Sequence, residues 1–223
     1  MSWNAEQVYT LVSPKLIEYL KGIDNLQQGL FQVDDFRGIR SQWTKDVFFE
    51  NENHERKHIK HSLPVDGLFV INPSMSRTAY DDKDNAFYTD YAEYKTNKWH
   101  FLENIEIAPM VLSLNLTLEQ CKLLAFLQQL NEEIKQPFVY YKCEMWGGDI
   151  EEEIAIVFDG EMKVYYFDEL IGEYKQMIGA EIKDLEDSTA LQKGLEAIGL
   201  VLPTHFFALH ETSFDWYPYR MID

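Results

Sequence analysis

Three histidines in the segment HERKHIKH have the spacing of metal ligands on one helical face: His54, His58 and His61. They stand at positions i, i+4 and i+7, and side chains at these intervals align along a helix. Three imidazoles are a credible zinc site, to which Glu50 or Glu52 could add a fourth ligand. The basic side chains interspersed with them oppose a divalent cation, however, and no HExxH pattern is present. We therefore favour a solvated basic segment and keep a metal site as the alternative.

Carboxylates are concentrated in a second segment, CEMWGGDIEEEIAIVFDG, whose pattern predicts two strands joined by a Gly-Gly turn. Strand alternation places Glu151 and Glu153 on the face opposite to the isoleucines, near the turn where Glu144 and Asp149 can approach them. Carboxylates brought together raise the pKa of one of them or recruit a cation, which in a cleft would suit acid–base catalysis or a metal. On an exposed hairpin end the same residues form a negative patch.

An aromatic side chain, Trp146, lies directly beside these carboxylates. Tryptophan is a common anchor at protein interfaces, and surrounding carboxylates would suit recognition of a basic protein. The alternative for Trp146 is ordinary packing in the core. We predict a partner-binding surface that consists of Glu144, Trp146, Asp149, Glu151 and Glu153.

Other catalytic and cofactor-binding patterns are absent from the sequence. The chain has no GxSxG elbow, no GxGxxG or GK[ST] phosphate loop, and only 11 glycines. A stretch that begins at Asp82 is similar to a calcium loop, but Phe87 stands where such a loop requires glycine. We therefore expect no cofactor, and a non-enzymatic function is favoured over an enzyme.

The formal net charge is −18, and the acidic excess is concentrated toward the C-terminus. Residues 138–223 carry 18 acidic and 6 basic side chains, a net charge of −12, against −1 for residues 1–62 and −5 for residues 63–137. Such a field repels nucleic acid and anionic membranes, and it accelerates encounter with basic partners. An acidic surface that only promotes solubility is the other interpretation.

The sequence also bears on the compartment. Its first residues contain no basic region followed by an uninterrupted apolar run, so we expect no secretory signal. No later apolar run approaches the roughly 18 residues of a membrane span. Cys121 and Cys143 lie among apolar neighbours, which is typical of reduced thiols in a core. These features predict a soluble, cytoplasmic protein with no membrane partner.

The N-terminal half is expected to contain helices and a strand. An apolar stripe that begins at Val8 predicts an N-terminal helix, and Ser13 followed by proline predicts a second helix that ends at Gly22. The segment LPVDGLFVINP predicts a strand. Thr117 and Gln120 form a capping box at the start of a strongly periodic helix.

The C-terminal part predicts a sheet. Three strands separated by turn dipeptides form a β-meander over about residues 138–168, and a short helix follows over about 189–198. We expect an α+β fold in which an antiparallel sheet is covered by helices. The expected organisation is a single domain of residues 1–223, with two lobes, 1–112 and 113–223, as the alternative.

These features together predict a non-enzymatic cytoplasmic protein that binds a basic protein partner. In composition the chain resembles the small acidic immunity proteins with which bacteria neutralise nucleases or other basic toxins. This resemblance implies a bacterial protein of the immunity or inhibitor type. The alternative function is a metal-dependent hydrolase, built on the three histidines or on the hairpin carboxylates.

Overall fold

The computed structural model of the chain describes residues 2–23, 26, 30–33, 47–50, 56–59, 68–71, 100–107, 116–146, 149–186, 188–200 and 220–221. The strands are β1 (Ser2–Leu11), β2 (Leu30–Val33), β3 (Val47–Glu50), β4 (Arg56–Ile59), β5 (Leu68–Ile71), β6 (Phe138–Trp146), β7 (Asp149–Asp159), β8 (Glu161–Asp168), β9 (Glu173–Ile178), β10 (Glu181–Asp184) and β11 (Arg220–Met221). The helices are α1 (Pro14–Lys21), the 3₁₀ helix η3 (His100–Leu102), α3 (Leu118–Ile134) and α4 (Ala190–Glu196).

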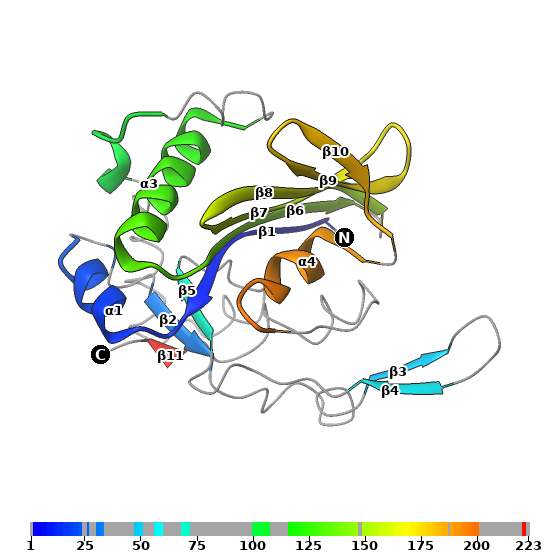
Figure 1. The fold of residues 1–223 in the computed structure, drawn as a ribbon, viewed down its shortest axis with the longest axis horizontal. Helices are drawn as coiled ribbons and strands as arrows, with labels where there is room; N and C mark the ends of the chain where they lie inside the picture. Colours follow the sequence, from blue (N-terminus) through cyan, green and yellow to red (C-terminus); the bar gives the residue numbers. More distant parts are fainter. Residues whose placement is uncertain are drawn as a thin grey trace.

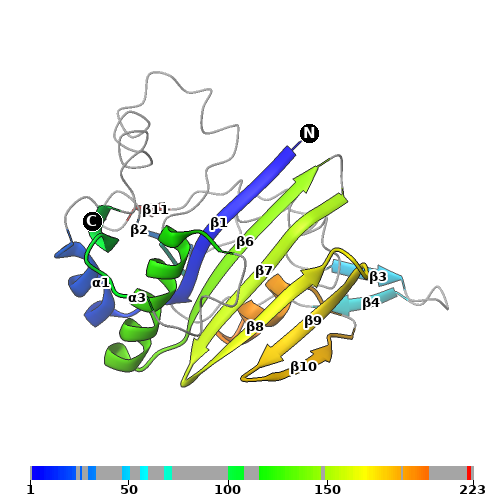
Figure 2. The same cartoon turned by 90° about the horizontal axis from the view of Figure 1, so that it is seen from above.

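The described strands form one antiparallel sheet and a separate hairpin. The sheet has the order β10-β9-β8-β7-β6-β1-β5-β2-β11, and β3 pairs with β4 in the hairpin. Strands β6 to β10 follow one another in sequence and in space, as Figures 1 and 2 show. The predicted meander over 138–168 is therefore confirmed, and it continues through two further strands that the sequence analysis did not predict.

Helices lie on both faces of the sheet. Figure 1 shows α3 on one side of strands β6 and β7 and α4 on the other. On the α3 side, Gln120 Nε2 donates a hydrogen bond to Glu6 of β1. On the α4 side, Gly194 lies so close to the sheet that a Cβ there would be 2.9 Å from Val139 Cγ1. The expected α+β fold, a sheet covered by helices, is confirmed for the described residues.

The N-terminal helix expected from Val8 is wrong, because residues 2–11 form strand β1. This strand lies between β5 and β6, so it is inside the sheet and not at an edge. Val8 and Tyr9 point to opposite faces, and both are only 1% exposed. A strand buried on both faces has no polar–apolar alternation, and its apolar run can therefore be mistaken for part of a helical stripe.

The three other predicted helices are confirmed. Helix α1 starts at Pro14, its N-cap Ser13 accepts a hydrogen bond from Leu16 N, and Gly22 is its C-cap. Helices α3 and α4 each begin with a complete capping box. Short local patterns of this kind are reliable because each satisfies backbone N–H groups that have no partner within the helix.

The core lies on both faces of the central strands, under α3 and under α4. Cys121 and Cys143 are both buried, as expected, and no disulfide bond joins them. The strand predicted in LPVDGLFVINP is β5, which is wholly buried. The calcium-like stretch that begins at Asp82 lies outside the described residues. No helix in the described part of the chain is both long enough and apolar enough to cross a membrane.

Candidate functional site

The end of the β6–β7 hairpin presents an exposed tryptophan beside carboxylates. Trp146 is the last residue of β6, pairs with Asp149 of β7, and is 63% exposed. Asp149 and Glu151 are exposed as well, and within the described part of the chain neither has a basic partner within 4.0 Å. Core packing of Trp146 is therefore excluded. We call Trp146, Asp149 and Glu151 the hairpin-end surface.

The remaining carboxylates of the predicted surface lie on opposite faces of the sheet. Glu144 is opposite Glu152 in the β6–β7 register, and Cys143 is opposite Glu153. Residues that face each other across two strands share a face, so Glu144 lies on the α3 side and Glu153 on the α4 side. The expected approach of Glu144 to Glu153 is therefore wrong.

Glu153 is buried, contrary to the expectation that it lies on an exposed hairpin end. It is 1% exposed. One carboxylate oxygen accepts hydrogen bonds from the Tyr141 hydroxyl (3.3 Å) and from Leu191 N of α4 (3.1 Å). The other accepts a hydrogen bond from the Tyr174 hydroxyl of β9. A side chain enclosed in this way cannot contact a partner, and Glu153 therefore does not belong to the hairpin-end surface.

Burial determines the electrostatics around Glu153. Desolvation raises the pKa of its carboxyl group from 4.5 to about 7, against the lowering effect of hydrogen bonds from Tyr174, Leu191 and Tyr141. Burial also raises the pKa of the Tyr141 and Tyr174 hydroxyls, and the nearby Glu153 charge raises both further. These hydroxyls therefore stay protonated and act as hydrogen-bond donors.

Glu153 lies where two neighbouring strands separate. Pairing between β7 and β8 runs from Ile154↔Tyr166 to Asp159↔Glu161, so in the described structure the part of β7 before Ile154 pairs with β6 alone, with a register shift at Glu151. In the sheet order β8 lies between β7 and β9, yet Tyr174 of β9 reaches Glu153 of β7. Through Glu153, β7 is connected to β6, to β9 and to α4.

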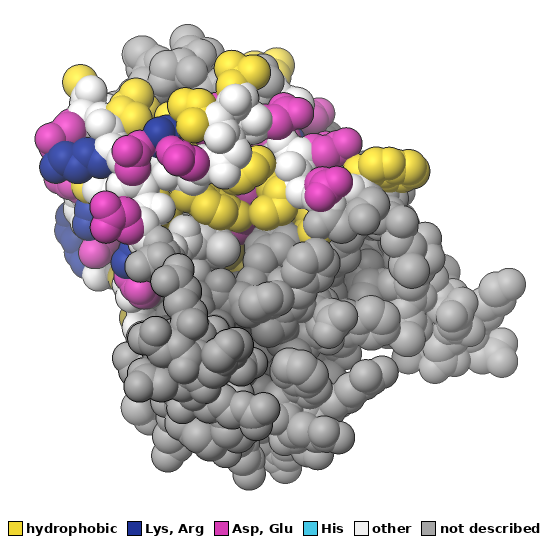
Figure 3. Space-filling model, turned by 90° about the vertical axis from the view of Figure 1, so that its right-hand side faces the viewer, with side chains coloured by type: hydrophobic (Ala, Val, Ile, Leu, Met, Phe, Trp, Pro, Cys, Tyr) yellow, Lys and Arg dark blue, Asp and Glu magenta, His cyan; other side chains and the backbone are white. Residues whose placement is uncertain are grey.

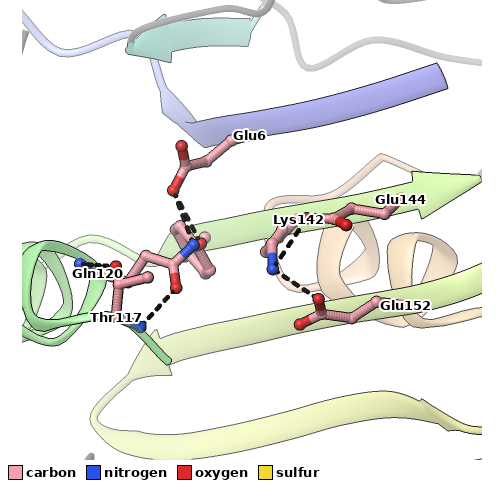
Figure 4. Close-up of polar contacts among 7 residues, drawn as sticks. Glu6, Thr117, Gln120, Lys142, Glu144 and Glu152 are labelled. Carbon is pink, nitrogen blue, oxygen red and sulfur yellow. Dashed lines mark hydrogen bonds and ion pairs between the residues drawn. The ribbon is translucent and has the colours of Figure 1, made fainter. Parts of the chain in front are cut away.

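The α3 side carries a lysine held between two carboxylates. Lys142 Nζ lies 2.5 Å from Glu152 Oε2 and 3.2 Å from Glu144 Oε1 (Figure 4). Desolvation lowers the pKa of Lys142, but its hydrogen bonds and attraction to Glu152 and Glu144 outweigh that effect and raise it overall. Glu144, although part of the predicted surface, thus already has a cationic partner within the chain.

A second polar group on this side fixes the start of α3 to the sheet. The Gln120 side chain accepts a hydrogen bond from Thr117 N (2.9 Å) and donates one to Glu6 Oε1 (3.2 Å) (Figure 4). The Tyr140 hydroxyl donates to the same Glu6 oxygen at 3.1 Å. Gln120 thus stabilises both the start of α3 and the contact between α3 and the sheet.

The structure describes part of the histidine segment. Residues Arg56–Ile59 form strand β4, in which His58 is opposite Phe48 of β3, so helical spacing does not apply there. His54 and His61 lie outside the described residues. Within the described parts of the chain, no group of three or more His, Cys, Asp or Glu side chains is arranged to hold a metal ion.

Sequence reasoning missed a pair of exposed apolar residues at the same end of the sheet as the hairpin-end surface. Leu170 and Ile171 lie in the turn between β8 and β9 and are 98% and 58% exposed. Their signal in the sequence is DELIGE, an apolar dipeptide between acidic residues where a turn normally has polar side chains.

Comparison of the chain with models of protein families, with curated proteins and with solved structures finds no match.

Proposed function

We propose that the chain is a non-enzymatic, cytoplasmic binding protein of the immunity or inhibitor type, which docks a basic protein partner on the hairpin-end surface. The observation that carries this proposal is the exposure of Trp146, at 63%, next to Asp149 and Glu151. Exposed tryptophan is uncommon on a surface without partners, and tryptophan is enriched among residues that dominate binding energies.

The gain from covering Trp146 is large enough to anchor a complex. Burial of the remaining exposed area of an indole ring, on the order of 100 Å², contributes about 2 to 3 kcal/mol. This corresponds to a change in affinity of tenfold or more, since about 1.4 kcal/mol is a factor of ten. Hydrophobic contact can therefore supply affinity, while charge selects the kind of partner.

The charge around the anchor favours a cationic partner. Residues 138–186 carry 13 acidic and 4 basic side chains, a net charge of −9. Among the four lysines, Lys142, Lys175 and Lys183 already form ion pairs with carboxylates of the same sheet. The excess negative charge therefore remains to attract a basic surface, and it does so mainly by accelerating association.

Site-specific crosslinking in a lysate of the native host tests this proposal. A photo-crosslinking amino acid replaces Trp146 in one sample and Leu118 in the control. Leu118 is an equally exposed apolar residue at the start of α3, with 61% exposure against 63% for Trp146. Both samples are irradiated at low and at moderate salt, with and without the substitutions Asp149→Lys and Glu151→Lys.

The proposal predicts one basic protein that is crosslinked from position 146 and not from position 118. Its yield falls at moderate salt and on charge reversal. Crosslinking of the same proteins from both positions, or of an acidic protein that charge reversal leaves unaffected, contradicts the proposal.

A further inference from the structure

The turn between β8 and β9 exposes two large apolar side chains. Leu170 is 98% exposed and Ile171 is 58% exposed. Turns usually carry glycine and polar residues, because a turn lies on the surface. An apolar dipeptide in this place costs solubility, and nothing in the turn geometry requires it.

This turn is held in one conformation by its own hydrogen bonds. The Asp168 carbonyl oxygen accepts from Ile171 N (3.2 Å) and from Gly172 N (2.7 Å). The Asp168 carboxylate accepts from Leu170 N at 3.2 Å. Gly172 has a φ of +76°, which glycine adopts without strain. The two apolar side chains are therefore presented on an ordered backbone, and a partner would lose little entropy in ordering it.

The base of the turn is fixed to the rest of the sheet. The rings of Phe167 and Tyr174, which are opposite each other on β8 and β9, have centroids 5.3 Å apart. The Tyr174 hydroxyl donates a hydrogen bond to the buried Glu153 of β7. Through this hydrogen bond Glu153 connects β9, which follows the turn, to β7, which follows the hairpin-end surface. It therefore helps to fix the position of the turn.

The turn and Trp146 lie at the same end of the sheet. Strand β6 ends at Trp146, β7 runs in the opposite direction, and β8 runs in the same direction as β6 and ends at the turn. Trp146 and the turn therefore lie at the end of the sheet where β6 and β8 finish, as Figures 1 and 2 show. Figure 3, which shows this side of the molecule, has apolar and acidic side chains next to one another over its described part.

We propose that Leu170 and Ile171 are a second apolar anchor of the same docking surface, and that the occupant is a cationic amphipathic segment of the partner. This inference rests on the proposed function. Carboxylates accompany both anchors: Asp149 and Glu151 at Trp146, and exposed Glu169 at the turn. Within the described residues Glu169 has no basic partner within 4.0 Å. A segment with apolar side chains between lysines or arginines matches this pattern.

Two peptides of equal charge serve as the probes. One has leucine and lysine at helical spacing, and in the other serine replaces each leucine. Each is titrated into the isotope-labelled full chain, and NMR follows the Trp146 indole and the methyl groups of Leu170 and Ile171. Dissociation constants are then compared for wild type, Trp146→Ala, the double variant Leu170→Ser/Ile171→Ser, and the control Leu118→Ser. All substituted side chains are exposed, and thermal unfolding confirms that each variant folds.

The inference predicts that the leucine-containing peptide shifts the signals at both anchors. The double variant and Trp146→Ala each weaken its binding about tenfold, while Leu118→Ser and the serine-containing peptide define the background. If Trp146→Ala weakens binding and the double variant does not, the second anchor is overturned and the proposed function stands. If neither variant weakens binding, both are overturned.

Discussion

Glu153 is the residue whose environment differs most from what its sequence context suggests. It is the last of three consecutive glutamates in a strand that reaches an exposed hairpin, yet it is 1% exposed and accepts three hydrogen bonds. The three hydrogen-bond donors stabilise the charged form of Glu153, but burial favours the neutral form more strongly. The pKa of Glu153 therefore rises to about 7.

Stability is therefore expected to depend on pH through Glu153. Its pKa is about 7 in the folded chain and its ordinary pKa is 4.5, so the folded chain holds this proton more tightly than the unfolded chain does. The stability that comes from this tighter proton binding is fully present below the pKa of Glu153 in the unfolded chain. It is lost as the pH rises through the pKa of Glu153 in the folded chain. Across this pH range the free energy of unfolding of the wild type should fall by about 3 kcal/mol, and that of Glu153→Gln should not show this fall.

Urea unfolding of wild type and Glu153→Gln at a series of pH values between these two pKa values measures this effect. The matched control is Glu151→Gln, since Glu151 lies two residues before Glu153 on β7 but is exposed. The control should keep the wild-type profile. Parallel profiles for wild type and Glu153→Gln would show that burial of Glu153 does not determine the pH dependence.

At the scale of elements, the contact between α4 and the sheet depends on a glycine. Gly194 lies in the middle of α4, where glycine costs about 1 kcal/mol relative to alanine. A Cβ at this position would lie 2.9 Å from Val139 Cγ1 and 3.0 Å from the Ala155 Cβ. The loss of helix propensity is therefore offset by the close approach that glycine permits.

Substitution of Gly194 by alanine should destabilise the fold by about 1 to 2 kcal/mol, because overpacking outweighs the gain in helix propensity. Denaturant unfolding of the single variant gives this value. In a Val139→Ala background the cost should fall, because the nearest methyl group is gone. A Gly194→Ala variant that is more stable than wild type would show that α4 is not held at the distance described.

The elements that the sequence predicted correctly are those specified by local patterns. A capping box predicts the start of α3 and turn dipeptides predict the hairpins of the meander, and the structure has these elements, and α4, within a few residues of their expected positions. The nature of β1 depends instead on its long-range pairing with β5 and β6, which no local pattern reveals. Strands β9 and β10 were missed because their exposed faces carry little apolar periodicity.

The candidate site was predicted in part for the same reason. Trp146, Asp149 and Glu151 lie at a turn, where the local sequence determines exposure, and they are exposed. Glu153 is covered by Tyr174 of β9 and by α4, both of which are distant in sequence. Its burial could be inferred only once the packing of these elements on β7 was known.

At the scale of the whole molecule, excess negative charge is expected to influence stability. With a net charge of −18, repulsion among carboxylates opposes the compact state, and salt screens that repulsion. Moderate salt should therefore raise the melting temperature measured by calorimetry at neutral pH. A decrease with salt would mean that ion pairs, such as those of Lys142, outweigh the repulsion.

The function that we propose is the docking of a basic protein on the hairpin-end surface. Its most direct test is the kinetics of binding to the partner captured by crosslinking, measured by surface plasmon resonance over a range of salt concentrations. Wild type is compared with Trp146→Ala and with the double variant Asp149→Lys/Glu151→Lys. Glu153 is left unchanged because it is buried.

Charge reversal should slow association about tenfold at low salt and reduce its salt dependence, with little change in dissociation. Trp146→Ala should instead speed dissociation about tenfold, because it removes the apolar anchor. Wild-type association and dissociation rates in both variants would contradict the claim, and would mean that the partner binds elsewhere on the molecule.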